Sequence, residues 1–163
     1  MRTVLPANWT GGLAEAETAG GFATPSIDGW VLVVGRDVAA ATVDPQRVEA
    51  MLSALGARFG TAQWFVTDAA NDRHGWAVAA GGELVRGYAF AGEQGHVWWH
   101  GDVTEAEHAL ACFVDDPRDS SDDDVKWWPE RRTVLALARA WSVDPSALHE
   151  RDLPPSCGWL GRL

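Results

Sequence analysis

The order of apolar and polar residues predicts three helices that pack one side against a core. The first begins at Asp44-Pro45, where aspartate can cap the helix and proline fits its first turn. It ends at Gly60, and its apolar residues recur every three or four positions. These residues are Val48, Met51, Leu52, Leu55 and Phe59. A capping-box pattern, Thr104-Glu-Ala-Glu107, predicts a second helix, and Pro129 opens a third stretch with helical spacing.

Runs of apolar and β-branched residues predict strands between these helices. Residues 28–35 (DGWVLVVG) form such a run closed by glycine, and we expect a buried strand there; residues 63–67 predict another strand. Between residues 74 and 100, two apolar segments flank Gly81-Gly82, a pair that suits a two-residue hairpin turn. A second turn, at residues 92–95, leads into HVWWH. This region therefore predicts an antiparallel meander.

The turns of the meander predict which residues face one another across its strands. The expected pairs are Ala80 with Glu83, Val78 with Val85, Trp76 with Gly87, Ala89 with Trp98 and Ala91 with His96. Because side chains alternate along a strand, one face then carries a defined set of residues. The set is Trp76, Val78, Val85, Gly87, Ala89, Ala91, His96, Trp98 and His100. Both faces are largely apolar, so we expect both to be covered.

These elements predict a fold of the α+β class. We expect a single domain over residues 1–163, with an antiparallel β-meander sheet and flanking helices. The length suits one core, and a hydrophobic fraction of 47% excludes wholesale disorder. Residues 153–163 are rich in proline and glycine and are expected to form a C-terminal tail.

A row of small residues on the meander is a candidate ligand site. Gly87 and Ala89 are expected to lie between Trp76 on one neighbouring strand and Trp98 on the other. Small side chains leave volume above a sheet, and either a closely packed helix or a ligand can fill it. In the second case Trp76, Gly87, Ala89 and Trp98 bind a small apolar ligand. The sequence leaves packed core and pocket as alternatives.

Two histidines are expected beside that row. In an enzyme, His96 or His100 would be the catalytic residue that moves a proton, in proton-transfer, cyclisation or isomerisation chemistry. The pair cannot share a metal ion, because residues four apart on a strand are separated by about 13 Å. His100-Gly-Asp102 with Glu105 and His108 forms only a loose group of potential ligands. We therefore predict neither a metal nor another cofactor.

The opposite face of the meander combines Arg86 with Tyr88. Arginine is frequent at interfaces and in anion sites, so Arg86 is a candidate for recognition. Stacking of Arg86 on a nearby aromatic ring, such as that of Trp99, explains the residue equally well. Both interpretations stay open at this point.

The charge of the chain changes the picture of its partners. There are 13 Lys and Arg residues against 23 Asp and Glu, a net charge of −10, which disfavours nucleic acid and anionic membranes. Six of the carboxylates fall within residues 115–124. They are Asp115, Asp116, Asp119, Asp122, Asp123 and Asp124. Such a stretch is either a solvated loop or an electrostatic attraction for a basic protein.

Two tryptophans follow this acidic stretch closely. Trp127 and Trp128 are consecutive, and two consecutive side chains of a regular element cannot both point into one core. One of them is therefore expected to be exposed as an anchor for a partner. Together, the acidic residues and the tryptophan pair are the candidate partner-binding residues.

The cysteines and the N-terminus favour a cytoplasmic protein. Cys112 and Cys157 are too few for a disulfide framework; Cys112 is expected to be buried and Cys157 partly exposed. The first residues lack the apolar core of a secretion signal, and no apolar stretch is long enough to cross a bilayer.

Several segments resemble one group of bacterial proteins. They are DGWVLVVG at 28–35, HGWAVAAGGELVRGYAFAGEQG at 74–95, TEAE at 104–107, AWSVDPSAL at 140–148 and GWLGRL at 158–163. The chain is similar in these segments to a family of small, largely uncharacterised bacterial proteins that are common in actinobacteria. Some members look like immunity partners of toxins. The resemblance implies a fold and brings no catalytic residues.

Three functions fit the sequence. The first is a non-enzymatic binding protein whose acidic residues and tryptophan anchors occlude a basic partner, in the manner of an immunity protein. The second is a small-molecule enzyme or ligand carrier that uses the Trp and His residues of the sheet face. The third is a structural or regulatory adaptor without a ligand.

Overall fold

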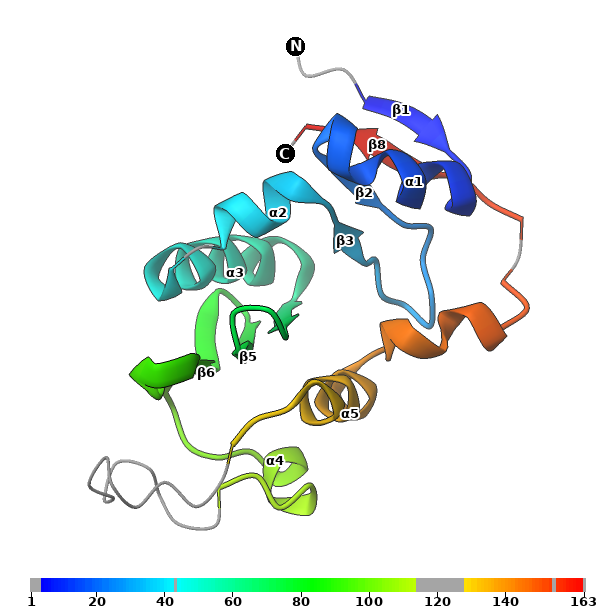
Figure 1. Ribbon diagram of the computed structural model, residues 1–163. Coiled ribbons are helices and arrows are strands. Elements are labelled where there is room, and N and C mark those ends of the chain that lie inside the picture. The colour runs from blue at the N-terminus through cyan, green and yellow to red at the C-terminus, as the bar shows by residue number, and fades with distance from the viewer. Residues whose placement is uncertain (1–3, 43, 114–127, 154, 163) are drawn as a thin grey trace. The chain divides into compact units, whose positions relative to one another are not determined.

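The computed structural model describes residues 4–42, 44–113, 128–153 and 155–162 (Figure 1). The chain divides into two compact units. The central unit is Pro45–Pro145, and the terminal unit combines Met1–Asp44 with Ser146–Leu163. Each unit joins a four-stranded antiparallel sheet to helices, which confirms the α+β class. A single domain over residues 1–163 stays a prediction.

An antiparallel meander forms the sheet of the central unit, as predicted. Its strands follow chain order: β4 (Thr61–Asp68), β5 (Arg73–Ala80), β6 (Glu83–Ala91) and β7 (His96–His100). The turn between β5 and β6 has φ values of 60° at Gly81 and 98° at Gly82. Glycine adopts such angles without a clash, which explains the glycine pair at this hairpin. A short 3-10 helix, η1 (Gly92–Gln94), joins β6 to β7.

The register of the meander differs from the prediction beyond its first turn. Ala80 pairs with Glu83 as expected, but a β-bulge then leaves Val85 out of register. Trp76 consequently pairs with Tyr88 instead of Gly87, and Val78 pairs with Arg86 instead of Val85. Because an offset of one residue exchanges the faces of a strand, Trp76 lies on the side of Arg86 and Tyr88.

A second irregularity lies between β6 and β7. Ala89 pairs with Trp98, as predicted, whereas His96 pairs with Phe90 and not with Ala91. The two bulges leave Val85 and Val97 without a paired residue, and these side chains are 52% and 41% exposed. The set of residues predicted for one face is therefore wrong for Trp76, Val78 and His96.

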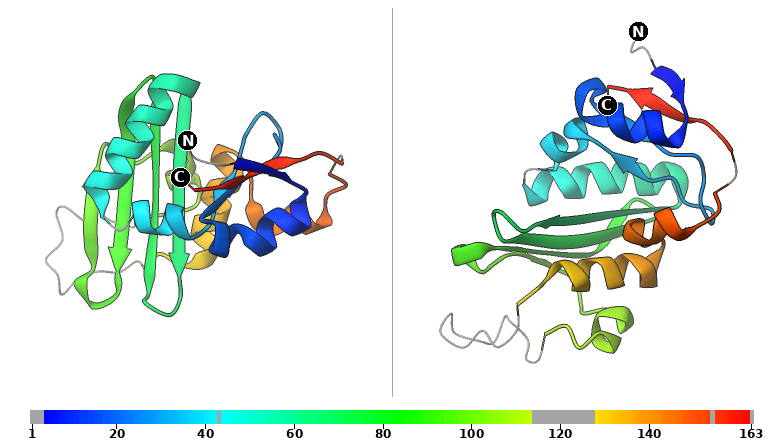
Figure 2. Two further views of the ribbon diagram at one scale, coloured as in Figure 1. Left: turned by 90° about the horizontal axis from the view of Figure 1, so that it is seen from above. Right: turned by 45° about the vertical axis from the view of Figure 1, so that its right-hand side comes forward.

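Helices cover both faces of the central sheet (Figure 2). Helix α3 (Pro45–Phe59) begins and ends where the sequence predicts, and packs Val48 and Leu52 on Ala62, Trp64, Ala77 and Ala79. On the other face, helices α4 (Glu105–Ala109) and α5 (Arg131–Trp141) contribute side chains to a second core. This core contains Trp76, Tyr88, Phe90, Cys112, Val134 and Leu137. Within the described residues, no helix is long and apolar enough to cross a membrane.

The sheet of the terminal unit joins the two ends of the chain. Its order is β1 (Val4–Ala7), β8 (Gly158–Gly161), β2 (Gly21–Ala23) and β3 (Val33–Val34), all antiparallel. Helix α1 (Trp9–Ala19) lies against β2 and β8 (Figure 1) and covers the buried ring of Phe22. Two short helices, α2 (Arg36–Ala41) and the 3-10 helix η3 (Pro145–Glu150), complete the described elements.

The face of this small sheet opposite Phe22 is apolar and exposed. The register aligns Val33, Ala23, Trp159 and Pro6 in one row across all four strands. Trp159 is 57% exposed and Val33 is 42% exposed. A row of apolar side chains at the surface distinguishes the terminal unit from the central one.

The predicted buried strand at residues 28–35 is wrong. Asp28 and Gly29 have φ values of 51° and 85° and make a turn between Ile27 and Trp30. Only Val33–Val34 of this run is extended as a strand, at the edge of the sheet, and both valines are exposed. The apolar run does contain a strand. A strand is buried only where other elements pack over it, and this edge strand is exposed.

Candidate functional site

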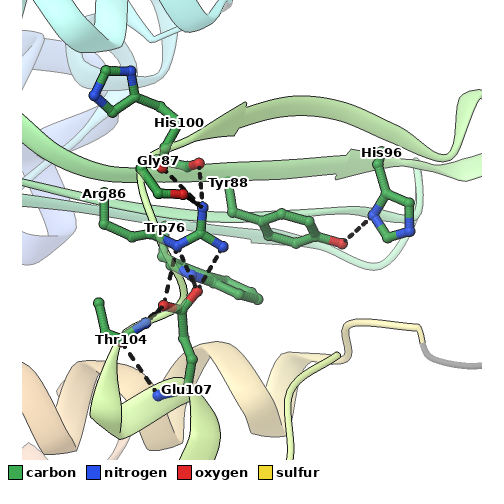
Figure 3. A network of polar contacts seen from close by, with 9 residues as sticks. Trp76, Arg86, Gly87, Tyr88, His96, His100, Thr104 and Glu107 are labelled. Carbon is green, nitrogen blue, oxygen red and sulfur yellow. Dashed lines mark hydrogen bonds and ion pairs between the residues drawn. The ribbon is translucent and has the colours of Figure 1, made fainter. Parts of the chain in front are cut away.

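Among the described residues of the central unit, the most densely bonded polar group is a buried ion pair, Arg86 with Glu107 (Figure 3). Arg86 projects from β6 towards α4, and both side chains are fully buried. The Arg86 Nε donates to both Glu107 oxygens, at 2.9 and 3.1 Å, and Nη2 lies 2.9 Å from Oε1. Burying such a pair is tolerable only when the remaining polar atoms are also satisfied.

Residues close to Glu107 in the sequence donate hydrogen bonds to its carboxylate. Thr104 caps α4, and the Glu107 Oε2 accepts from the Thr104 amide and hydroxyl, each at 2.7 Å. The predicted capping box is therefore confirmed. The indole Nε1 of Trp76 donates to Oε1 at 2.7 Å. One carboxylate thus fastens α4 to both β5 and β6.

The Arg86 guanidinium also makes contacts within the sheet. Its Nη1 donates to the carbonyls of Gly87 (3.0 Å) and His100 (2.9 Å). The guanidinium carbon lies 4.2 Å from the centre of the Trp99 ring, which confirms the predicted stacking. The recognition role that was the other interpretation of Arg86 receives no support, because no part of the side chain is exposed. This network organises the core and offers no group to a substrate.

The two histidines predicted as catalytic candidates occupy different faces of the sheet. The Nδ1 of His96 is hydrogen-bonded to the Tyr88 hydroxyl at 2.8 Å, and burial raises the pKa of that hydroxyl above its ordinary value. His100 pairs with Gly87 on the face towards α3, and its Nε2–H donates to the Leu84 carbonyl at 3.0 Å. The structure therefore does not bring His96 and His100 together.

The four predicted ligand-binding residues do not share a surface either. The Trp98 ring lies over Gly87: a Cβ at Gly87 would be 2.5 Å from the ring. Ala89 is buried, and Trp98 also makes an edge contact with Trp64 at 6.4 Å between ring centres. Trp76 lies on the opposite face, where it binds Glu107. The space above Gly87 is filled by an indole ring of the sheet itself.

The predicted partner-binding residues are described only at one end. Asp115, Asp116, Asp119, Asp122, Asp123, Asp124 and Trp127 lie outside the described residues. Trp128 is described, is 56% exposed, and packs edge-on against the ring of Phe90 at 5.6 Å. Phe90 is buried in β6 and also contacts the His96 ring at 5.9 Å. Trp128 is thus an exposed aromatic residue that packs against a buried ring of the sheet.

Comparisons with protein families, curated proteins and solved structures gave no match to this chain.

The remaining reactive groups are separated from one another. Among the described residues, no three His, Cys, Asp or Glu side chains gather as a metal site, and His100, Asp102, Glu105 and His108 do not form one. Burial, reinforced by the negative charge of Glu107, raises the pKa of the Cys112 thiol to about 12. Cys157 is exposed.

A small relay of polar side chains lies at the start of β5. His74, which is buried, is hydrogen-bonded through Nδ1 to the Thr67 hydroxyl at 3.0 Å. Its Nε2 lies 3.5 Å from Asp72 Oδ1, and the Asp72 side chain is 64% exposed. The two strands are paired at Thr67 and His74, so the relay ties β4 to β5 across the hairpin.

Sequence reasoning missed Glu107 as the partner of Arg86. The available signal was the arginine itself: a charged residue in a strand expected to be covered on both faces requires a buried counter-charge. The capping box located Glu107 on a helix, but nothing in the sequence placed that helix over Arg86. The pairing depends on tertiary structure.

Proposed function

We propose that the chain is a non-enzymatic binding protein that recognises a basic protein through Trp128 and the adjacent acidic residues 115–124. The observation that carries this proposal is the exposure of Trp128 on the buried Phe90 ring. Exposed tryptophans with fixed positions are the side chains that most often dominate protein–protein binding energy. Six carboxylates in the ten residues 115–124 would attract a basic surface to it.

The overall charge supports the same choice of partner. A net charge of −10 accelerates encounter with a basic protein and slows encounter with acidic polymers. An immunity-type role, in which the chain occludes an active surface of a basic toxin, belongs to this proposal together with a cytoplasmic location. Both rest on the sequence resemblance and on the charge.

The alternative, a small-molecule enzyme or ligand carrier, is less well supported. It needs His96 or His100 beside an open row of small residues, and the ring of Trp98 occupies the space at Gly87. The buried carboxylate of Glu107 already accepts hydrogen bonds from Trp76, Arg86 and Thr104. A general base needs a lone pair that faces the substrate.

The test is affinity capture from an extract of the source cell at low salt. The chain should retain a basic protein that elutes as salt is raised, because exposed charge interactions are screened. Trp128→Ala should lose this protein, and so should a variant with Asn at Asp122, Asp123 and Asp124. Trp159→Ala is the matched control, since Trp159 is equally exposed, at 57% against 56%.

Two results would contradict the proposal. One is the capture of no basic protein under these conditions. The other is a captured protein that Trp128→Ala and the Asn variant retain as well as the unaltered chain does.

A further inference from the structure

We propose that Asp28 is a site of spontaneous backbone modification: its side chain and the Gly29 nitrogen form a cyclic imide that opens to isoaspartate, and Arg151 restrains this reaction. The modification is independent of the binding role proposed above, and all three residues belong to the terminal unit. Asp28-Gly29 is the single Asp-Gly pair of the sequence, which contains no Asn-Gly pair. Glycine hinders attack by its own nitrogen least, because it has no side chain.

The two residues form the tip of an exposed hairpin turn. The amides of Ile27 and Trp30 donate to each other's carbonyls at 2.7 and 2.8 Å, and φ is positive at both Asp28 and Gly29, as a type I′ turn requires. The Asp28 side chain is 61% exposed, and a Cβ at Gly29 would meet no atom within 4 Å. Within the described residues, the Gly29 N–H donates to no acceptor. The reacting nitrogen and carboxyl are therefore unobstructed and accessible to water.

The reaction needs no reagent other than water. The Gly29 nitrogen attacks Cγ of Asp28 and forms an N–Cγ bond, while the amide proton and the carboxyl hydroxyl leave together as one water molecule. Water then adds at one of the two carbonyls of the ring. Opening at the Cγ carbonyl restores aspartate. Opening at the main-chain carbonyl of Asp28 leaves the chain running through Cβ and Cγ, which is isoaspartate, with the atomic composition of the original chain.

Arg151 opposes the first step because it holds the carboxylate. Its Nη1 donates to Oδ2 of Asp28 at 2.9 Å and its Nη2 donates to Oδ1 at 3.0 Å, so both oxygens are engaged. These hydrogen bonds lower the pKa of the Asp28 carboxyl below its ordinary value. The hydroxyl leaves as water only from the neutral carboxyl, and the carboxylate is a poor electrophile. Removal of Arg151 therefore makes the reactive form more abundant.

A second aspartate of the chain separates ion pairing from reactivity. Asp144 accepts from Arg139 at 3.0 Å, and the residue that follows it is Pro145. The proline nitrogen carries no hydrogen and cannot close a neutral imide. Both aspartates are paired with arginine, but only Asp28 precedes a nitrogen that can react. Isoaspartate is therefore expected at Asp28 and not at Asp144.

The experiment incubates the folded chain for several weeks at physiological temperature and neutral pH. Isoaspartate is measured as the fraction of chains that endoproteinase Asp-N, which cleaves before aspartate but not before isoaspartate, leaves uncut at Asp28. Arg151→Gln should raise the rate about two- to fivefold, the range that loss of an exposed ion pair supports. Arg151→Lys, which keeps the charge without the forked pair, should lie between. Arg132→Gln is the control, because it removes an exposed ion pair with Glu130 and should leave the rate at Asp28 unchanged.

Absence of isoaspartate at Asp28 in the unaltered chain and in Arg151→Gln overturns the site. Equal rates in these two proteins, or an equal increase in Arg132→Gln, overturn the role of Arg151. Asp28→Asn tests the turn separately, because asparagine forms the same imide by losing ammonia and needs no protonated carboxyl. It should convert faster than the unaltered chain, and its persistence as asparagine overturns the reactivity of the turn. Matching circular dichroism spectra exclude unfolding of the variants as the cause of faster reaction.

Discussion

The two sheets of the molecule have the same number of strands and differ in how much of each is covered. The central sheet has strands of five to nine residues and carries packed helices on both faces. The terminal sheet has strands of two to four residues; α1 covers the face of Phe22, and the row containing Val33 and Trp159 is exposed. Strand length sets the area on which a second layer can pack.

This difference explains where the polar chemistry of the core lies. A buried ion pair survives only where water is excluded and every donor finds an acceptor. The layer between the central sheet and α4 buries Arg86 and Glu107 fully and provides hydrogen-bond partners for the carboxylate and for Nε and Nη1 of the guanidinium. In the terminal unit the comparable pair, Arg151 with Asp28, is exposed, although its distances of 2.9 and 3.0 Å are just as short. The two ion pairs have similar distances, and the difference in burial decides how much each contributes to stability.

Removing the buried counter-charge is expected to have the largest effect. Glu107→Ala leaves the guanidinium of Arg86 without its carboxylate, and breaking such a pair costs about 3–5 kcal/mol of unfolding free energy. Urea denaturation followed by far-ultraviolet circular dichroism measures the change. Glu105→Ala is the control on the same helix, because Glu105 is exposed; it should change stability by less than about 0.5 kcal/mol. Equal small effects of both variants would contradict the burial of the pair.

The next comparison uses one tryptophan from each sheet. Trp64→Ala removes a side chain that is 6% exposed and packs under α3, and should cost about 3–5 kcal/mol. Trp159→Ala removes a side chain that is 57% exposed, so the loss should stay below about 1 kcal/mol. The same denaturation experiment measures both. A large loss for Trp159→Ala would mean that another surface covers this face in solution, and the contrast between the sheets would disappear.

The sequence predicts the elements of the central unit well because their signals are local. Asp44-Pro45 and Gly60 mark the ends of α3, Gly81-Gly82 marks the hairpin, and Thr104 with Glu107 marks the start of α4. Each signal depends on residues within a few positions of one another. Tertiary contacts are not needed to read them.

The faces of the meander were harder to predict because one inserted residue reverses them. The bulge at Val85 moves Trp76 away from Gly87 and onto the face of Tyr88. On that face Trp76 contacts Glu107 and the second core, and both contacts join residues that are far apart in the sequence. For the candidate site, the sequence predicted that either Trp127 or Trp128 is exposed, but it could not show that Phe90 packs against Trp128.

A glycine-to-alanine change tests whether the space above Gly87 is filled, and its effect on the free energy of unfolding should be intermediate. At Gly87 a Cβ would lie 2.5 Å from the Trp98 ring, so Gly87→Ala should cost about 1–3 kcal/mol by overpacking. In a Trp98→Leu background the added methyl group should be tolerated, with a cost below about 0.5 kcal/mol. The difference between the two costs is a coupling energy, read from the four denaturation curves. Independence of the two changes would mean that the Trp98 ring does not occupy this space.

The two cysteines allow the central and terminal units to be compared by chemical labelling, because each unit contains one cysteine. The exposed Cys157 of the terminal unit should react readily with a thiol reagent at pH 8. The buried Cys112 of the central unit should react at a rate at least on the order of a hundredfold lower. Ellman's reagent should therefore count one thiol in the native protein and two in denaturant. Cys157→Ser, the control, should leave no fast-reacting thiol.

The raised pKa of Cys112 also fixes the direction of a pH effect. Folding shifts this pKa from 9.0 to about 12, so the folded chain retains a proton that the unfolded chain releases above pH 9. The contribution of Cys112 to stability is fully present below pH 9.0 and is lost progressively as pH rises towards 12. Cys112→Ala should make the decline in this pH window shallower, even though it lowers stability at neutral pH by leaving a small cavity. An unchanged slope would show that Cys112 ionises as easily in the folded chain as in the unfolded one, and that the second core admits water.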